Sequence, residues 1–268
     1  MSTPDGSSSE ELVPEPELEL VPEQRLAGGN MGPVSRRGDV VLRTTGPWTP
    51  AVHRLLAHCR AQGMDGVPEP RGVETDDQHG ERERLEYLPG DVPAYPMPAW
   101  LWAQEALDSA TDLLRRFHAA SATADRTGPW RSASHEPVEV LCHNDAAPYN
   151  MVFRDGRAVG LIDADHASPG PRVWDLAYLA YRIVPLTTDR ADGFTDAQRD
   201  ARLDRLLARY GEPAVTADVL RETTAERLDE LAVFSVQKAV ELDNPELAEH
   251  AALYERDALA IRARITDR

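Results

Sequence analysis

Residues 140–165 read VLCHNDAAPYNMVFRDGRAVGLIDAD. They contain a histidine, an aspartate two positions later and an asparagine five positions after that, at His143, Asp145 and Asn150. A chain of this composition would contain that spacing by chance about once in a hundred, so the pattern alone is suggestive. Two apolar runs flank Asp155-Gly156, and Asp-Gly between such runs is a strong signal for a two-residue turn. The segment therefore predicts a loop that leads into a β-hairpin.

The register of this hairpin predicts where oxygen-bearing side chains meet. Counting outward from the turn, Asn150 faces Leu161, and Asp163 lies two residues further along the same face, about 7 Å away. An amide oxygen and a carboxylate suit Mg²⁺, which needs few protein ligands when it is bound to phosphates. We therefore expect Asn150 and Asp163 to hold a nucleotide-bound magnesium ion. Asp145 precedes them on the loop, where a carboxylate can orient an acceptor hydroxyl and take its proton.

Other interpretations of these residues remain open at this point. Aspartates beside turns are usually solvated, and Asp155 is interpreted in that way. His143 is expected to brace the loop rather than to act as a second base. In a metal-dependent hydrolase His143 and Asp145 would instead be metal ligands, but such a site needs further histidines, and the other histidines show no ligand spacing.

The sequence resembles the aminoglycoside phosphotransferase and choline kinase group, whose fold is similar to that of the protein kinases. The resemblance spans roughly residues 25–265 and is most specific at residues 143–150, 162–165 and 171–178. It implies an α+β, protein-kinase-like fold with two lobes. The N-terminal lobe would be small and β-rich, and the C-terminal lobe would be larger and mainly helical.

The resemblance also implies roles for residues of the larger lobe. Asp145 would be the catalytic base, and Asn150 and Asp163 would bind Mg²⁺. Asp165 would assist a second metal ion or order the loop. Asp175 would be a buried aspartate that supports the catalytic loop, a structural role that it would share with His143.

In the smaller lobe the resemblance implies contacts to the nucleotide. Gly28 and Gly29 would form a loop whose backbone N–H groups approach the phosphates, and main-chain groups of Glu86 and Leu88 would pair with adenine. Arg43 stands at the strand position where a lysine normally contacts the α- and β-phosphates. The helix expected at residues 50–62 has no glutamate to pair with Arg43. This departure puts nucleotide affinity in question, because Arg and Lys are not interchangeable.

Composition and charge limit the classes of protein to which the chain can belong. Its apolar share of 41% is typical of a globular protein, and no apolar run approaches the roughly 20 residues of a membrane helix. A net charge of −17 argues against general nucleic-acid binding.

Residues 1–22, acidic and rich in Ser and Pro, are expected to be a disordered tail. Residues 23–90 would be the nucleotide-binding lobe and 91–268 the catalytic and substrate lobe. Without a secretory signal, a cytoplasmic location is expected.

These observations favour an ATP- and Mg²⁺-dependent phosphotransferase that moves the γ-phosphoryl group to a hydroxyl of a small molecule. The acceptor would be aminoglycoside-like, an amino alcohol or another metabolite. GTP as donor, antibiotic resistance and oligomeric state are left open. Acidic residues such as Glu226 and Glu230 would either recognise a cationic acceptor or form a solvated helix face. The alternative function is a catalytically weak or inactive kinase-like module that binds nucleotide and regulates, suggested by Arg43 and its missing partner.

Overall fold

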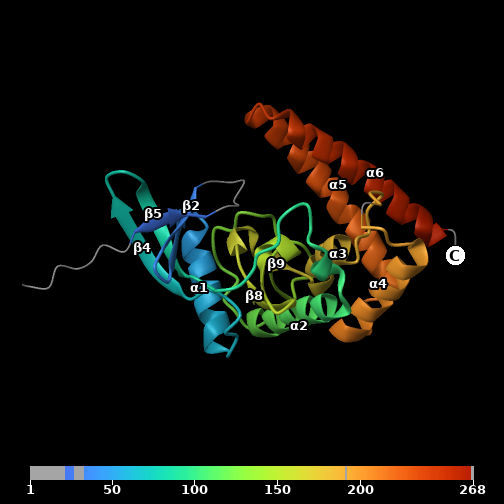
Figure 1. The fold of residues 1–268 in the computed structure, drawn as a ribbon, viewed down its shortest axis with the longest axis horizontal. Helices are drawn as coiled ribbons and strands as arrows, with labels where there is room; N and C mark the ends of the chain where they lie inside the picture. The colour runs from blue at the N-terminus through green and yellow to red at the C-terminus, as the bar shows by residue number, and fades with distance from the viewer. Residues whose placement is uncertain (1–21, 27–32, 191, 267–268) are drawn as a thin grey trace, which may run out of the picture.

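The computed structural model describes residues 22–26, 33–190 and 192–266. Nearly all of the expected tail (1–22) lies outside these residues, and so do Gly28 and Gly29. The described chain forms a small lobe built on a β-sheet and a larger lobe made mainly of helices (Figure 1). No helix in the described ranges is both long enough and apolar enough to cross a lipid bilayer.

The small lobe is a five-stranded antiparallel sheet in the order β1-β2-β3-β5-β4. Its elements are β1 (Glu23–Arg25), β2 (Val34–Arg37), β3 (Val40–Thr44), α1 (Thr49–Ala61), β4 (Pro70–Asp76) and β5 (Gly80–Glu86). Helix α1 buries Val52, Leu55 and Cys59, whose spacing of three and four residues places them on one face. In the β3–β5 pair, Arg43 lies directly opposite Glu83. This pairing determines the surroundings of Arg43 in the site.

The large lobe is built around one buried helix. Its elements are η1 (Ala99–Trp102), α2 (Gln104–Ser121), β6 (Val140–Cys142), η2 (Pro148–Asn150), β7 (Met151–Arg154), β8 (Arg157–Leu161), η3 (Ala164–His166), β9 (Ser168–Gly170), α3 (Arg172–Ile183), α4 (Asp196–Tyr210), α5 (Ala217–Glu241) and α6 (Pro245–Thr266). Leu107, Leu114 and Phe117 of α2 are fully buried. The β7–β8 hairpin lies on this helix, and its Ala158 N–H donates to Ser109 Oγ at 2.9 Å.

The segment that joins the lobes is bound to the hairpin. Asp91 and Phe153 exchange two backbone hydrogen bonds of 2.8 Å, and Leu161 N–H donates to Gly66 O at 2.7 Å. Gly90 has φ +147°, and a Cβ atom there would lie 2.5 Å from Phe153 O. Glycine is therefore required where the linker crosses the hairpin. Strand β7 follows the predicted catalytic loop, so both lobes meet beside it.

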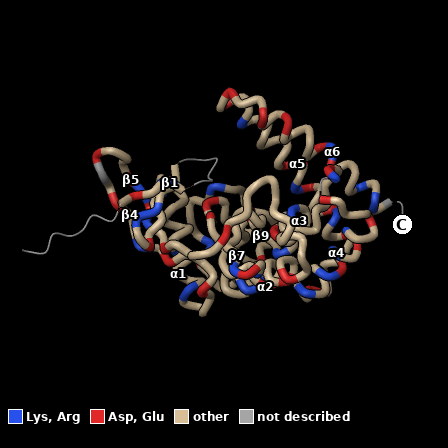
Figure 2. The backbone as a smooth tube through the Cα atoms, in the orientation of Figure 1, with Lys and Arg blue, Asp and Glu red and all other residues tan. Residues whose placement is uncertain are grey.

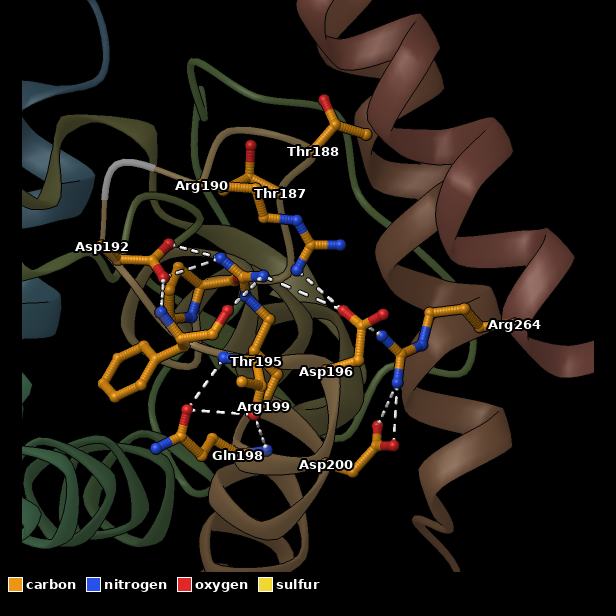
Figure 3. Close-up of polar contacts among 12 residues, drawn as sticks. Thr187, Thr188, Arg190, Asp192, Thr195, Asp196, Gln198, Arg199, Asp200 and Arg264 are labelled. Carbon is orange, nitrogen blue, oxygen red and sulfur yellow. Dashed lines mark hydrogen bonds and ion pairs between the residues drawn. The ribbon is translucent and has the colours of Figure 1, made fainter.

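The last two helices extend from the large lobe as a hairpin, and the end of α6 returns to the start of α4 (Figure 1). Helix α4 begins with a capping box in which Thr195 and Gln198 exchange hydrogen bonds. The side chain of Arg264 on α6 contacts Asp196 at 2.9 Å and Asp200 at 2.7 Å (Figure 3). These contacts hold α6 against the lobe that carries the site.

Candidate active site

The predicted catalytic loop connects β6 to β7 and is held by Asp175 in the first turn of α3. The Asp175 carboxylate is fully buried and accepts hydrogen bonds from the backbone N–H groups of His143 (2.5 Å) and Asn144 (2.7 Å). Burial would raise the pKa of Asp175, but the hydrogen bond and charge of His118, with the charges of Arg227 and His143, lower it. Asp175 therefore stays ionised and fixes the start of the loop.

His118, which the sequence predicts to be a helix histidine with satisfied polar groups and not a ligand, completes this network. Its Nε2 lies 3.0 Å from the Asp175 carboxylate and its Nδ1 lies 2.7 Å from the Tyr210 hydroxyl. The ring is fully buried. The sequence signal for this network was a histidine on the apolar face of a helix. A buried imidazole requires polar partners, so such a histidine indicates a buried polar network.

Asp145 is the carboxylate that the loop presents. Its Oδ1 accepts a hydrogen bond from Tyr149 Oη at 3.0 Å, and its Oδ2 accepts one from Asn150 Nδ2 at 2.8 Å. Asn150 Nδ2 also donates to the Asp145 carbonyl at 3.0 Å. The amide nitrogen of Asn150 is thus used by Asp145, whereas no hydrogen bond of a described residue uses its side-chain oxygen. The two side chains are brought together, and that oxygen can serve a cation.

The predicted pairing of Asn150 with Leu161 is wrong by one residue. Met151 faces Leu161, because a bulge between Val152 and Phe153 shifts the register. Asn150 instead accepts a backbone hydrogen bond from Ile162 at 2.9 Å. This shift places Asp163 immediately after the residue that pairs with Asn150.

His143 lies between the loop and the Asp163 segment. Its Nδ1 accepts the Asp145 backbone N–H at 3.3 Å, and its Nε2 lies 3.0 Å from Ile162 O. The ring is buried and packs edge-on against Phe117. In this position His143 links the backbone of Asp145 to the segment that carries Asp163.

Arg43 reaches from the small lobe into this site. Its Nη1 donates to Asp163 Oδ1 and its Nη2 to Asp165 Oδ1, both at 2.6 Å. Its Nε and Nη2 also donate to Glu83 Oε1, at 2.8 and 2.6 Å. The prediction that Arg43 lacks an acidic partner is therefore wrong: the partner comes from the neighbouring strand β5 instead of from helix α1.

Helix α1 contributes to the same group through His53, whose Nε2 lies 2.8 Å from Glu83 Oε2. Burial would raise the pKa of Glu83, but the hydrogen bond from His53 and the charge of Arg43 lower it. Burial would similarly lower the pKa of Arg43, and three carboxylates reverse that effect and raise it. Arg43 supplies the positive charge at this position, and the only lysine of the sequence, Lys238, lies near the end of α5.

The predicted metal ligands form a set of hard oxygen donors, the type that Mg²⁺ prefers. In the part of the chain that the structure describes, no three His, Cys, Asp or Glu side chains form a metal cluster by themselves. Arg43 uses one oxygen of each of Asp163 and Asp165, and the Asp163 side chain is 44% exposed. A nucleotide-bound ion that needs few protein ligands fits the remaining oxygens of Asn150 and Asp163.

The predicted adenine contacts lie at the end of β5. The N–H of Glu86 is used within the sheet, where it donates to Glu69 O at 2.9 Å. The main chain of Leu88 makes no backbone–backbone hydrogen bond with the other described residues, and its side chain packs over Gly160 of β8. Leu88 thus lies over the hairpin with its main-chain groups available to a ligand.

The acidic residues of α5 lie apart from the predicted catalytic loop. Glu226, Asp229 and Glu230 line a cavity of about 700 Å³ whose lining does not include Asp145. Asp229 pairs with Arg262 at 2.7 Å, and Glu230 lies 3.1 Å from His135. Two of the three acids are therefore engaged with residues of the same chain.

The chain is similar in sequence to known proteins. A sequence model of the phosphotransferase enzyme family matches residues 129–223, which include the loop, the hairpin and Asp175. The chain is 32% identical over 226 residues to the trifolitoxin immunity protein of Rhizobium leguminosarum bv. trifolii. This alignment covers 81% of this chain and 82% of that protein.

Solved structures share the fold at low sequence identity. The GDP and kanamycin complex of APH(2'')-IIIa is 13% identical with a TM-score of 0.65, and the match covers 91% of this chain and 95% of that one. A choline/ethanolamine kinase family protein from Mesorhizobium loti is 16% identical with a TM-score of 0.59, covering 90% and 87%. An aminoglycoside phosphotransferase from Streptomyces rimosus, with ADP and streptomycin, is 16% identical with a TM-score of 0.51, covering 72% and 88%. The predicted two-lobed, protein-kinase-like α+β fold is confirmed.

Proposed function

Because the chain belongs to the phosphotransferase enzyme family, as its sequence predicted, we propose that it transfers the γ-phosphoryl group of ATP or GTP to a hydroxyl of a small molecule. The observation that carries this proposal is the placement of Asp145. Its carboxylate is oriented by Tyr149 and Asn150, on a loop that Asp175 fixes through two backbone N–H groups. Phosphoryl transfer asks a protein mainly for such positioning and for charge neutralisation.

In this proposal Asp145 accepts the proton of the acceptor hydroxyl. The acceptor oxygen bonds to the γ-phosphorus, and the bond from that phosphorus to the bridging oxygen breaks and releases the nucleoside diphosphate. Mg²⁺, held with the nucleotide by oxygens of Asn150 and Asp163, would neutralise phosphate charge. Arg43 would contact the α- and β-phosphates, and Asp165, 2.6 Å from it, would order its side chain. Gly28, Gly29 and the main chains of Glu86 and Leu88 would complete the nucleotide site.

The similarity to an immunity protein supports one biological role for this reaction. Phosphorylation of a toxic compound would inactivate it and protect the cell. The alternative, a non-catalytic regulatory module, loses its main argument because Glu83 supplies the acidic partner that Arg43 was expected to lack.

Radiolabelled ATP and GTP, each with Mg²⁺ and pooled aminoglycosides, amino alcohols, sugars and hydroxy acids, provide the test. We expect label to pass to at least one acceptor, and this transfer to disappear in Asp145→Asn. Nucleotide-induced thermal stabilisation without transfer to any pool would support the regulatory module instead.

A further inference from the structure

Within the described residues, the side chain of Arg182, in the last turn of α3, makes hydrogen bonds only with phenol groups of tyrosines. Its Nη2 donates to the hydroxyls of Tyr178 and Tyr254, both at 2.9 Å, and its Nη1 donates to the Tyr95 hydroxyl at 3.3 Å. These residues come from α3, from α6 and from the linker between the lobes. Arg182 is half-buried, and Tyr95, whose hydroxyl it contacts, is 64% exposed, so the group lies near the protein surface.

A continuous series of hydrogen bonds joins this arginine to the proposed base. The Tyr178 hydroxyl lies 2.7 Å from the Tyr149 hydroxyl, and the latter donates to Asp145 Oδ1 at 3.0 Å. Arg182 therefore lies three hydrogen bonds from Asp145. A small acceptor whose hydroxyl meets Asp145 can reach Arg182 with another of its groups.

The positive charge of Arg182 is not balanced by the residues around it. No carboxylate in residues 22–26, 33–190 and 192–266 forms an ion pair with it, although acidic and basic residues are interspersed throughout both lobes (Figure 2). Asp257 on α6 is buried and already accepts hydrogen bonds from Tyr181, Thr187 and Thr188. Burial raises the pKa of Tyr178 to about 12, so that phenol stays neutral. One guanidinium N–H, at Nε, is buried and has no hydrogen-bond partner in the part of the chain that the structure describes.

The same guanidinium also lies over the faces of three tyrosine rings. Its Cζ lies 4.8 Å from the ring centre of Tyr181, 5.1 Å from Tyr178 and 5.7 Å from Tyr254. Aromatic faces that could bind an ammonium group are therefore already used by a cation. A second cation would meet like-charge repulsion there, whereas an anion would offset the cost of keeping an arginine out of bulk water.

We propose that Arg182 binds an oxyanion of the phosphoryl acceptor, so that the substrate is an alcohol bearing a carboxylate or phosphate group and not a polycation. The proposal rests on the proposed function and names the acceptor class of the same site. It is supported by the lack of a carboxylate partner for Arg182 among the described residues, by its contact with the exposed Tyr95 and by its connection to Asp145. Arginine is well suited to this role because its planar fork binds carboxylate and phosphate with two hydrogen bonds.

Four small probes that each carry a primary alcohol test the charge preference: glycerol, glycerate, glycerol 3-phosphate and ethanolamine. Transfer from Mg·ATP and thermal stabilisation would both be measured, and the two anionic probes distinguish carboxylate from phosphate. We expect glycerate or glycerol 3-phosphate to be favoured over glycerol, and ethanolamine to be the poorest. A preference for ethanolamine, with transfer still dependent on Asp145, would overturn the acceptor class and leave the proposed function intact.

Variants of Arg182 show whether this side chain causes the preference. We expect Arg182→Gln to raise the KM of the anionic probe about tenfold to a hundredfold, as for loss of a charge-assisted hydrogen bond, without changing the KM of Mg·ATP. Arg182→Lys should restore part of the affinity, and it replaces the glutamine variant if that one does not fold. Arg190→Gln, at an exposed arginine paired with Asp196, is the matched control.

Three outcomes separate the proposals further. An unchanged KM of the anionic probe in Arg182→Gln would overturn the role of Arg182. If no probe is phosphorylated but an anionic probe stabilises the wild-type protein and not Arg182→Gln, the anion site stands, and the pooled-acceptor assay decides the proposed function. If no probe is phosphorylated or bound, the anionic acceptor class is overturned, and transfer to any of the pools would leave the proposed function intact.

Discussion

Glu83 accepts two hydrogen bonds from Arg43 across the β3–β5 pair, and its other carboxylate oxygen contacts His53 of α1. Residues of β3, β5 and α1 thus form one buried polar cluster. The register of β3 and β5 places Glu83 directly opposite Arg43, so the arginine is held without a glutamate from the helix. The same guanidinium reaches Asp163 and Asp165 in the large lobe, which couples the two lobes at the site.

Glu83→Gln should weaken nucleotide binding, because Arg43 loses its buried counter-ion and gains conformational freedom. We expect the KM for Mg·ATP to rise about tenfold, the effect of losing one strong charge-assisted hydrogen bond. Initial-rate kinetics at varied ATP would measure it. Glu81→Gln, on the same strand but exposed, is the control. An unchanged KM would show that Glu83 does not position Arg43.

Arg43→Lys keeps the positive charge but loses the planar fork that reaches three carboxylates. We expect kcat/KM for ATP to fall about tenfold. Activity equal to or above that of the wild type would mean that the position needs only a cation near the phosphates.

Asp145→Asn should remove the proposed base while keeping the shape of the side chain. We expect kcat to fall by about 10² to 10⁴, the usual contribution of general acid–base catalysis, with Mg·ATP affinity nearly unchanged. Quenched-flow measurements and nucleotide titration would separate the two quantities. Asp155→Asn at the hairpin turn, where φ of +51° suits asparagine, should have wild-type kinetics. Comparable activity in the Asp145 variant would exclude this residue as the base.

Asp175 should make stability depend on acid pH. Its pKa is lower in the folded protein than in the unfolded chain, so its contribution is complete above the unfolded pKa of about 4 and is lost as pH falls through the folded value. We expect Asp175→Asn to lower the free energy of unfolding by about 3 kcal/mol at neutral pH. Urea denaturation from pH 7 to 3 should show less loss of stability in this variant. Parallel pH curves for both proteins would contradict the assignment.

Gly90→Ala should disturb the linker between the lobes, because the new Cβ atom would overlap Phe153 O and φ is +147°. We expect a loss of at least about 2 kcal/mol of stability from strain and overlap combined. Gly211 also has a positive φ, +76°, but a Cβ atom there would have no atom within 4 Å. The loss of stability in Gly211→Ala therefore measures backbone strain without overlap. Equal losses in both variants would show that the close approach to Phe153 costs nothing.

Local signals predicted much of the architecture correctly. Arg43 lies on a strand as expected, the helix expected at residues 50–62 lies at Thr49–Ala61, and the turn at Asp155-Gly156 lies where turn chemistry places it. Both turn residues have positive φ, which asparagine-like residues and glycine tolerate. Such features depend on neighbours in sequence, so one chain is sufficient to predict them.

Features that depend on pairing between distant segments were missed. The bulge near Val152 shifts the hairpin by one residue, and the available signal was Gly160, a glycine inside β8 that lies opposite Val152. Glu83 lies 40 residues from Arg43, and their contact depends on the β3–β5 register. His118 meets Asp175 only because α2 packs beside α3. Arg182 likewise acquires its surroundings from α6 and the linker, which its own helix does not reveal.

Tyr254 belongs to α6, whereas Asp145 belongs to the loop between β6 and β7. Asp175 of α3 holds the start of this loop, and Arg264 and Asp257 hold α6 to the lobe. Mutations at Tyr254 can therefore alter the surroundings of Arg182 while Asp175 still fixes the start of the loop. Descendants of such a gene could diverge in the compounds they modify and inherit the same reaction unchanged.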